Sequence, residues 1–391
     1  MIPRLADRLR YVEGSATLAL AAKAKALTNA GKPVLDFTAG EPDFPTPGPI
    51  KQAGIQAIRA EHTKYTPVAG IPELRAAIVD TVNRQRGTSY QPSQAIATCG
   101  TKHALFNAFQ ALCQPGDEVI VLSPYWVSFP AIVRLAGGTP VIVKTREEDR
   151  FLPDPAAIRA AVTPATRAII VNSPSNPTGA VIDAPRLAAI AAIVIERQLV
   201  VVSDEIYDQL TYPPAQHVSI VQAAPHVVDH TILVGGVSKT YSMTGWRIGY
   251  AVGPGPWIDA MMRVQSHSTS NPTSISQDAA LAALTGDQQP VARMREEFQR
   301  RRDRLINGLN GLSPMRCSPP DGAFYAWCNV SALRQSSEET ARQWLDEVLV
   351  AAAPGEGFGA EGFIRLSFAA PLETIDEALR RLRRWMAQRN T

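Results

Sequence analysis

The chain has 391 residues, of which 45% are hydrophobic and 19% are charged. This is the composition of an ordinary globular protein with room for roughly two or three domains, and it excludes disorder along the whole chain. The 39 Lys and Arg residues nearly balance the 36 Asp and Glu residues, which leaves a net charge of +3. So small an excess argues against nucleic acid or an anionic membrane as the main partner.

Residues 1–14 are polar and lack the apolar centre of a secretory signal, and no run reaches the roughly 18–20 apolar residues of a transmembrane helix. The cysteines form no CxxC pair and have no histidine at zinc-finger spacing. Such cysteines favour free buried thiols in a reducing compartment over a metal site or a disulfide framework. We therefore expect a cytoplasmic protein without a metal; the cysteines concerned are Cys99, Cys113, Cys317 and Cys328.

Short β-branched runs alternate with longer segments of helical period through the first two thirds of the chain. Most of these runs are continuously apolar, which indicates strands that are buried on both faces of a sheet. Their β-α-β-α order predicts an α/β fold with a largely parallel, doubly wound sheet. The expected strands are 95–98, 118–122, 140–143, 168–171, 199–203, 231–234 and 247–252, and the clearest helices are 101–112, 125–136 and 184–197.

The pattern changes near residue 285. The segment 291–312 has one charged and one apolar face, which predicts a long amphipathic helix. Apolar runs at 323–328, 348–352 and 363–368, followed by an amphipathic helix at 372–386, predict a smaller α+β unit.

Lys239 lies in the VSKT segment 237–240, just beyond an expected strand. A lysine is a nucleophile toward carbonyl groups only when its ammonium group is made easier to deprotonate. Arg247 and the Ser238 hydroxyl, close by in the sequence, indicate a bound anion. Taken alone, the segment fits an ordinary surface lysine in a loop better than a catalytic one.

Asp204 closes the apolar run 199–203, and Tyr207 follows three residues later. An acid at the carboxyl end of a buried parallel strand faces the ligand crevice of an α/β sheet, where its charge needs a cationic or N–H partner. Tyr207 lies on the same side when a turn or a helix follows. The alternative is that Asp204 caps the N-terminus of a helix, and the residues alone leave both possibilities open.

Two further strand ends lead into turns with polar residues. In the segment NSPSNPTG, residues 172–179, two prolines and Gly179 hold Asn176 in one orientation. Gly100-Thr101-Lys102 lies between a strand and a helix, where free N–H groups and the positive helix end favour phosphate. Each could be an ordinary turn. Neither a Walker motif nor GxGxxG occurs, which weighs against ATP and NAD.

Together and in this order, the motifs resemble fold-type I pyridoxal-phosphate enzymes, and within them the class I/II aminotransferases of a bacterial aspartate aminotransferase-like subgroup. The resemblance extends over nearly the whole chain. It implies a large cofactor-binding domain over residues 45–280, with a mostly parallel seven-stranded sheet flanked by helices, and a small α+β domain made of residues 1–44 and 281–391. Besides the segments above, its motifs are GSAT 14–17, GEPDF 40–44, KY 64–65, GIPELR 70–75, SPYWVS 123–128, PG 354–355 and IRLSF 364–368.

The resemblance implies pyridoxal 5'-phosphate as the cofactor and assigns the catalytic roles. Lys239 would hold the cofactor as an internal aldimine and, once freed, would move a proton from the substrate's Cα. Asp204 would pair with the pyridinium nitrogen. Tyr207 and Asn176 would hydrogen-bond the phenolic oxygen of the ring, and Trp126 would stack on its face.

The remaining site residues follow from the same resemblance. Six residues would surround the phosphate: the backbone N–H groups of Gly100, Thr101 and Lys102, with Ser238, Arg247 and, from a second subunit, Tyr65.

On the substrate side, Arg365 would bind the α-carboxylate, helped by the Gly40 backbone, beside Trp126 and Asn176. Lys102, Ser15 and Thr17 would meet the second carboxylate of a dicarboxylate. The alternatives are that only the backbone of Lys102 acts, on the phosphate, and that Ser15 and Thr17 cap a helix.

The resemblance thus implies a homodimeric aminotransferase that moves an amino group between an L-amino acid and a 2-oxo acid. The favoured pair is L-aspartate and 2-oxoglutarate, giving oxaloacetate and L-glutamate. One alternative is a prephenate or aromatic amino-acid aminotransferase with the same pocket. Others are a carbon–sulfur β-lyase on the same fold and a cofactor-binding regulatory protein, and the presence of Lys239 weighs against the latter.

Overall fold

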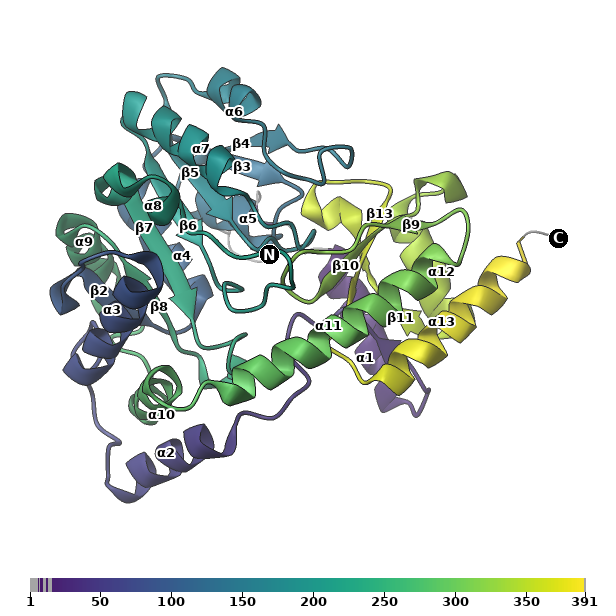
Figure 1. The fold of residues 1–391 in the computed structure, drawn as a ribbon, viewed down its shortest axis with the longest axis horizontal. Helices are drawn as coiled ribbons and strands as arrows, with labels where there is room; N and C mark the ends of the chain where they lie inside the picture. The colour runs from purple at the N-terminus through teal and green to yellow at the C-terminus, as the bar shows by residue number, and fades with distance from the viewer. Residues whose placement is uncertain (1–5, 7, 10–11, 13–15, 390–391) are drawn as a thin grey trace, which may run out of the picture.

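The protein is described by a computed structural model that covers residues 6, 8–9, 12 and 16–389 (Figure 1). A seven-stranded sheet forms the larger part, and helices flank it. A smaller part, built around a four-stranded sheet, lies beside it. This confirms the α/β fold class with a mostly parallel sheet. The domain boundaries near residues 45 and 280 stay a prediction.

The large sheet has the strand order β2-β8-β7-β6-β5-β3-β4. In the described part of the chain, β8 runs antiparallel to both of its neighbours, and the other neighbouring pairs are parallel. The strands are β2 (Ala95–Thr98), β3 (Glu118–Ser123), β4 (Thr139–Lys144), β5 (Thr166–Asn172), β6 (Val200–Asp204), β7 (Thr231–Gly236) and β8 (Gly249–Val252).

Both faces of this sheet are buried because apolar residues alternate between two separate cores. Val201 packs in the core on one face and Val202 in the core on the other. Helices α3, α7 and α10 contribute to the first core, and α4, α5 and α9 to the second. The helices of this part are α2 (Gly48–Arg59), α3 (Pro72–Arg86), α4 (Thr101–Leu112), α5 (Ser128–Leu135), α6 (Pro155–Ala161), α7 (Ala184–Glu196), α8 (Ile220–Ala223), α9 (Gly255–Ser266) and α10 (Ser274–Thr285).

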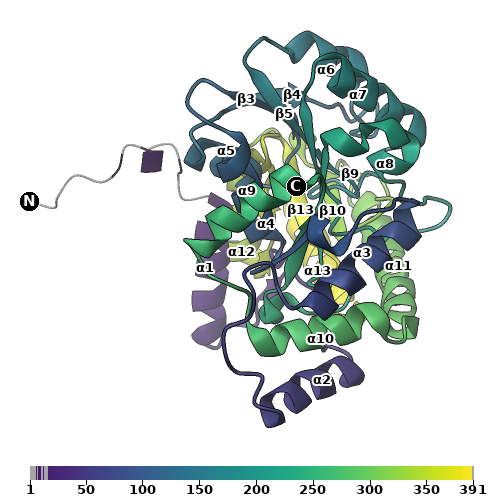
Figure 2. The ribbon, with the colours of Figure 1, turned by 90° about the vertical axis from the view of Figure 1, so that its left-hand side faces the viewer.

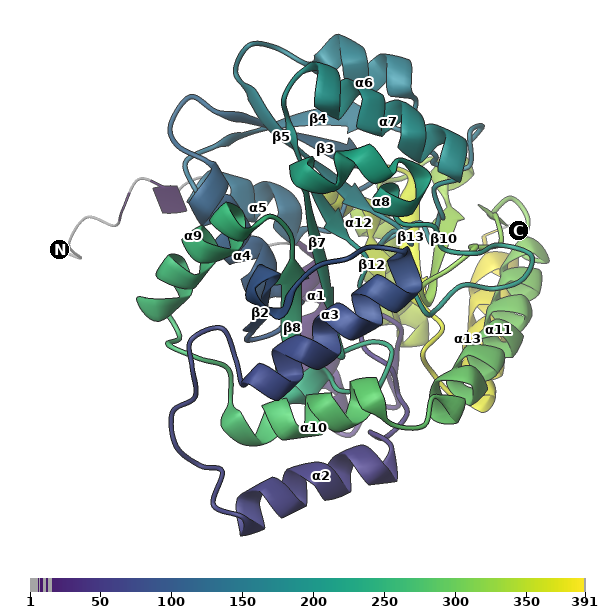
Figure 3. The same ribbon diagram turned by 60° about the vertical axis from the view of Figure 1, so that its left-hand side comes forward.

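Helices α2, α3 and α10 lie side by side at one edge of the molecule, as Figures 2 and 3 show. The α2 helix is outermost, and its side chains Ile55 and Ile58 are exposed. The loop between α2 and α3, which carries Tyr65, lies at the same edge.

The smaller part packs its four-stranded sheet, in the order β12-β13-β10-β9, against long helices. Phe298, Trp344 and Trp385 are fully buried in this core. The long helix α11 contributes Val291 to a core of the large part and Phe298 to this one, so it joins the two (Figure 1). The elements are α11 (Gln289–Asn310), β9 (Arg316–Cys317), β10 (Tyr325–Asn329), α12 (Ser337–Val348), β11 (Val350–Ala351), β12 (Ala353–Pro354), β13 (Phe363–Ser367) and α13 (Leu372–Ala387).

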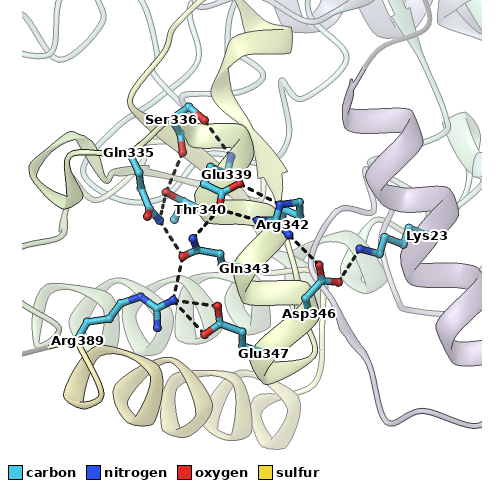
Figure 4. A network of polar contacts seen from close by, with 10 residues as sticks. All are labelled: Lys23, Gln335, Ser336, Glu339, Thr340, Arg342, Gln343, Asp346, Glu347 and Arg389. Carbon is cyan, nitrogen blue, oxygen red and sulfur yellow. Dashed lines mark hydrogen bonds and ion pairs between the residues drawn. The ribbon is translucent and has the colours of Figure 1, made fainter.

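The N-terminal segment belongs with this smaller part. Strand β1 (Leu35–Asp36) pairs in parallel with β11. Helix α1 (Ala16–Asn29) packs Ala24 against Leu345 and Ala351. An exposed ion pair of 2.6 Å between Lys23 Nζ and Asp346 Oδ1 on α12 adds to this packing. Figure 4 shows that Asp346 belongs to a polar network along α12 that also reaches Arg389 beyond the end of α13. These contacts fix α1 against the smaller part.

Some sequence predictions need correction. The expected strand 247–252 begins only at Gly249, because Arg247 has a left-handed backbone with φ of 57°. The expected helix 125–136 begins at Ser128, since the Tyr125 N–H donates to Phe358 O instead (3.0 Å). The four cysteines are free, but Cys99 and Cys113 are only half-buried. Among the described residues no helix is long and apolar enough to cross a membrane.

Candidate active site

A cavity of about 410 Å³ lies where the carboxyl ends of the large sheet's strands face the smaller part. This is the place where open α/β sheets bind ligands. Most of the residues predicted from the sequence to form the site line this cavity. They are Gly40, Thr101, Lys102, Trp126, Asn176, Asp204, Tyr207, Ser238, Lys239, Arg247 and Arg365.

Lys239 follows β7 and points into this cavity, where Nζ donates a hydrogen bond to Gly40 O. Burial lowers the pKa of Lys239 to about 8, against the opposing effect of Glu41. The amine is therefore far easier to deprotonate than an ordinary lysine, as nucleophilic chemistry requires. The alternative of an ordinary surface lysine does not fit this position.

Asp204 is the last residue of β6 and is 3% exposed. A turn follows it, not a helix, so the helix-cap alternative is wrong. Its Oδ1 accepts a hydrogen bond from the Ile206 N–H within this turn (3.2 Å). Burial and the neighbouring Glu205 raise the pKa of Asp204 to about 7, although Ile206 and Lys239 act in the opposite direction. A cationic group in the cavity would keep this carboxylate charged.

Tyr207 lines the same cavity because the turn brings it to the side of Asp204. Its hydroxyl lies 2.8 Å from the hydroxyl of Tyr325, the first residue of β10. Burial, followed by the Tyr325 contact, raises the pKa of Tyr207 well above its ordinary value. Both hydroxyls therefore stay protonated near neutral pH. One of their two hydrogens is used between them, so one hydroxyl is left to donate to a ligand.

Arg365 on β13 is 5% exposed, and burial lowers its pKa. Its Nη1 donates to Asn176 Oδ1 (2.9 Å) and its Nη2 to Thr38 O (2.8 Å). The guanidinium lies over the rings of Tyr325 and Phe358, 4.4 and 4.8 Å from their centroids. Within the described residues its buried Nε has no hydrogen-bond partner. A buried cation whose partners are all neutral is prepared for an anionic ligand.

Asn176 is held for this contact by β5, the neighbour of β6. Its backbone N–H donates to Oδ1 of Asn172, the last residue of β5 (2.9 Å). Asn172 Nδ2 in turn donates to Asp204 O (3.0 Å), and the register pairs Asn172 with Asp204. With Asn176 Oδ1 engaged by Arg365, its Nδ2 is left for a ligand.

The turn before α4 packs closely against Arg247. Gly100 has φ of 88°, and a Cβ there would lie 2.3 Å from Arg247 Nη2. A Cβ on Gly249 would lie 2.2 Å from the Thr101 backbone nitrogen. The Gly100 N–H donates to Thr98 O (2.7 Å), so of the three N–H groups predicted for an anion only those of Thr101 and Lys102 remain. The helix N-terminus, Ser238 and Arg247 meet at this end of the cavity.

Trp126 and Lys102 lie together at the cavity wall, with Lys102 Nζ 4.9 Å from the centroid of the indole ring. Burial and then Arg247 lower the pKa of Lys102. The side chain of Lys102 therefore faces the cavity together with Trp126, in addition to the backbone N–H that Lys102 offers to an anion.

The other predicted residues lie elsewhere. Tyr65 is 91% exposed and does not line the cavity of its own chain. Ser15 lies outside the described residues. Thr17 lies in α1, and its side chain is outside the described part.

Sequence reasoning missed several residues that line the cavity, above all Thr38, Asn172, Tyr325 and Phe358. Asn172 could have been found, because it directly follows the expected strand 168–171. Thr38, Tyr325 and Phe358 carry no such signal, since only the packing of the smaller part brings them to the cavity.

The comparisons with known proteins agree over nearly the full length. The aminotransferase class I and II family matches residues 32–382. An aspartate aminotransferase of Geobacillus stearothermophilus is 45% identical, over 99% of this chain and 100% of that protein. An aspartate/prephenate aminotransferase of Thermus thermophilus is 46% identical, over 97% and 98%.

Solved structures are similar as well. The Thermus thermophilus aspartate aminotransferase with maleate has a TM-score of 0.93 and 46% identity, and the match covers 98% of this chain and 100% of that one. The aspartate aminotransferase of Rhizobium meliloti has a TM-score of 0.95 and 38% identity, with 98% and 99% covered.

Proposed function

This chain belongs to the class I and II aminotransferases, and from that premise we propose that it transfers the amino group of L-aspartate to 2-oxoglutarate with pyridoxal 5'-phosphate as cofactor. The observation that carries the proposal is one cavity in which a lysine amine of lowered pKa, a buried carboxylate and a buried guanidinium face each other. Members of this family are pyridoxal-phosphate-dependent transaminases.

The residues present fit this cofactor. A protonated ring nitrogen would meet Asp204, whose buried carboxylate has no cation in hydrogen-bond contact within the described chain. A phosphate group suits the N-terminus of α4, where Ser238 and Arg247 also lie. The face of Trp126 and the amide of Asn176 are available to the ring.

When bound, pyridoxal 5'-phosphate supplies an aldehyde that reacts with amines and a ring that takes up the electrons of a broken Cα–H bond. Lys239 would supply the amine that holds the cofactor and, once displaced, would take the proton from the substrate's Cα. A pKa of about 8 suits both roles, because a useful fraction of the amine is neutral near neutral pH. The carbonyl of Gly40 accepts a hydrogen bond from Lys239 Nζ and keeps this amine in the cavity.

The other side chains would orient the cofactor and the substrate and adjust the electron demand of the ring. The Asp204 carboxylate would hold a proton on the ring nitrogen, which strengthens the pull on electrons. Tyr207 and Asn176 would donate hydrogen bonds to the phenolic oxygen of the ring. Arg365 would bind the α-carboxylate of the amino acid through its planar fork, including Nε, which has no partner in the described part of the chain.

A dicarboxylic substrate needs a second cationic contact, because Arg365 cannot hold both carboxylates. Lys102 is the candidate, since its ammonium group lies at the cavity wall beside Trp126. Ser15 and Thr17 remain proposed contacts to the same carboxylate. The solved structure of the Thermus thermophilus relative contains maleate, which is a dicarboxylate, and this supports a dicarboxylic substrate. A lysine is a flexible point charge, so we expect moderate specificity.

We also propose that two copies of the chain form the working enzyme. Tyr65 is exposed and does not line the cavity of its own chain, although the resemblance assigns it to a phosphate. If Tyr65 reaches the cavity of a second copy, its exposed position in its own chain agrees with a contact to the phosphate.

The test is a half-reaction panel. Purified enzyme loaded with pyridoxal 5'-phosphate is mixed with single amino acids while the cofactor's absorbance is followed. Aspartate and glutamate should convert it fastest. Lys102→Ala should lower the specificity constants for these two by about 10- to 100-fold, the size of a charged hydrogen bond, and leave phenylalanine and alanine nearly unchanged. Equal losses on all four amino acids would contradict the role of Lys102.

A second candidate is the amination of prephenate. The relative named aspartate/prephenate aminotransferase favours it, and Val127 and Phe358 give the cavity an apolar wall beside its cations. Enzyme in the amino form, mixed with prephenate or oxaloacetate, separates the candidates. Return of the aldehyde absorbance with only one of the two 2-oxo acids assigns the enzyme to that substrate.

A further inference from the structure

A cluster of buried charged and polar side chains lies directly behind Asp204 and takes no part in the chemistry proposed above. The extended backbone continues one residue past β6, because the Glu205 N–H donates to Val234 O (2.9 Å). Side chains alternate along extended backbone, so Glu205 points away from the cavity that Asp204 lines. Glu205 is itself buried.

Both oxygens of this carboxylate are fully engaged. Oε2 accepts from Arg86 Nε (2.8 Å) and pairs with His217 Nε2 (3.1 Å). Oε1 accepts from the hydroxyls of Ser219 (2.6 Å) and Ser203 (3.0 Å). Burial alone would raise the pKa of Glu205, but Arg86 and His217 outweigh it and lower the pKa to about 2. The carboxylate is therefore charged, and fixed from several elements at once.

Arg86, at the end of α3, makes a second ionic contact. Its Nη2 donates to Asp208 Oδ2 (2.6 Å), and the guanidinium is 8% exposed. The Asp208 N–H donates to Glu205 O (3.0 Å), which closes the turn. One guanidinium thus holds residues 205 and 208, and Tyr207 lies between these two fixed points. Asp204 immediately precedes the first of them.

Helices α3 and α8 anchor the cluster to the protein. Ser219 caps α8, and Gln222 Nε2 on α8 donates to Gln85 O at the end of α3 (2.9 Å). Other ionisable groups near this cluster are Tyr250, which faces Arg86, and Tyr90, which faces both Glu205 and Asp229. Replacing a buried ionic cluster by apolar residues often costs no stability, so stability alone does not account for it.

We propose that Arg86 and Glu205 are positioning residues, which hold Asp204 and Tyr207 against the cofactor ring by fixing the turn 204–208 from the face of the sheet opposite the cavity. This rests on the proposed function, because Asp204 and Tyr207 must contact the ring. Hydrogen bonds to the ring weaken steeply when donor and acceptor shift. A loosened turn should therefore change the ionisation of the bound cofactor before it changes substrate binding.

The main test uses Arg86→Lys in the holoenzyme, because this variant keeps the charge between the two carboxylates and loses only the fork. The readout is the pH midpoint of the bound cofactor's absorbance change. The midpoint should rise by about one pH unit, since weaker contacts from Tyr207 and Asp204 favour the protonated chromophore. The kcat should fall by about 10-fold, while KM for aspartate changes by less than about twofold because Arg365 is untouched.

The matched control is Arg381→Lys. Arg381 also joins a carboxylate, Glu377 (2.7 Å), to backbone carbonyls, including Pro33 O (2.9 Å), but it lies away from the cavity. Its midpoint should stay at the wild-type value. An Arg86→Lys enzyme that loses only thermal stability, with an unchanged midpoint and kcat, overturns the inference.

A double-mutant cycle with Tyr207→Phe then asks through which group Arg86 acts. The Arg86→Lys shift should be smaller in the Tyr207→Phe background, and equal shifts in both backgrounds overturn the inference alone. An unchanged midpoint in Tyr207→Phe itself overturns both the proposed contact of Tyr207 and this inference.

Should Arg86→Lys fail to fold, Ser219→Ala removes one hydrogen bond from Glu205 with no change of charge. A smaller upward shift of the midpoint is expected in Ser219→Ala, and an unchanged midpoint would refute the positioning role.

Discussion

At the scale of the residue, the site depends on ionisable groups that burial leaves without full charge partners. Lys239 and Asp204 both have pKa values moved toward neutrality by burial, and Arg365 Nε has no hydrogen-bond partner among the described residues. Each is costly in the protein alone and becomes favourable when a ligand of opposite charge arrives. Such groups define the ligand more sharply than the shape of the cavity.

Lys239→Ala should abolish transamination, because no other amine in the described cavity is placed beside Asp204. The fold and much of the cofactor affinity should survive, since the phosphate contacts at α4 are untouched. Steady-state rates and a cofactor titration by absorbance check this. Near-normal rates would show that the mechanism is wrong.

The pKa of Asp204 predicts a pH dependence of stability in the cofactor-free protein. Its folded value, about 7, lies above the ordinary value of 3.8, so the folded state binds more protons between these pH values. The stability that Asp204 contributes is fully present below pH 3.8 and is lost as the pH rises toward 7.

The free energy of unfolding of the wild type, relative to Asp204→Asn, should thus fall by a few kcal/mol over this window, at about 1.4 kcal/mol for each pH unit. Urea unfolding at several pH values measures it. Added pyridoxal 5'-phosphate should flatten the dependence, because its ring nitrogen is proposed to pair with the carboxylate. A flat difference without cofactor contradicts the shifted pKa.

At the scale of the element, strand ends and helix starts place the chemistry. Strands β5, β6 and β7 end side by side and carry Asn172, Asp204 and, just beyond, Lys239. The α4 helix begins at the same edge, so its positive end faces the same space. Close backbone packing between Gly249 and Thr101 sets how near this helix end comes.

Gly100→Ala should weaken cofactor binding by about 10-fold or more, the size of one charged hydrogen bond, because its Cβ would displace Arg247. Gly116→Ala is the matched control: Gly116 has φ of 99°, like the 88° of Gly100, but open space around the added Cβ. The control should lose about 1–2 kcal/mol of stability, with unchanged cofactor affinity. Fluorescence titration with pyridoxal 5'-phosphate compares them, and equal affinities would show that the contact is irrelevant.

At the scale of the whole molecule, the cavity exists only because two parts of the chain meet. The large sheet supplies Asp204 and Lys239, and the smaller part supplies Arg365, Tyr325 and Phe358. The α1 helix, tied to α12 by Lys23, adds Ala21 to the wall. A second copy would complete the site through Tyr65.

Hybrid dimers test this assembly. Chains with both Tyr65→Phe and Lys239→Ala are mixed with wild-type chains, so that the site with the intact Lys239 lacks the partner's tyrosine hydroxyl. Its cofactor affinity should fall by about 10-fold, as for one lost hydrogen bond to a charged group. Hybrids of wild type with the single Lys239→Ala chain are the control. Equal affinity in the two hybrids would place Tyr65 outside the partner's site.

The sequence by itself determined the fold class, the family and the parts of the site that follow strands directly. Asp204, Asn176 and the turn at Gly100 were found because a buried parallel strand has a recognisable pattern, and its carboxyl end has a known place. The roles proposed for Lys239 and Arg365 come from the order of the motifs along the chain.

Only the tertiary structure decided what lies opposite those strand ends. Tyr325, Phe358 and Thr38 come from the smaller part, more than a hundred residues away from Asp204 along the chain, and no local pattern marks them. The Gly100 N–H was expected to be free, but the fold uses it for Thr98. Likewise, nothing local joins Arg86 to Glu205 and Asp208. Contacts between distant segments depend on how the layers pack, and that information is spread over the whole chain.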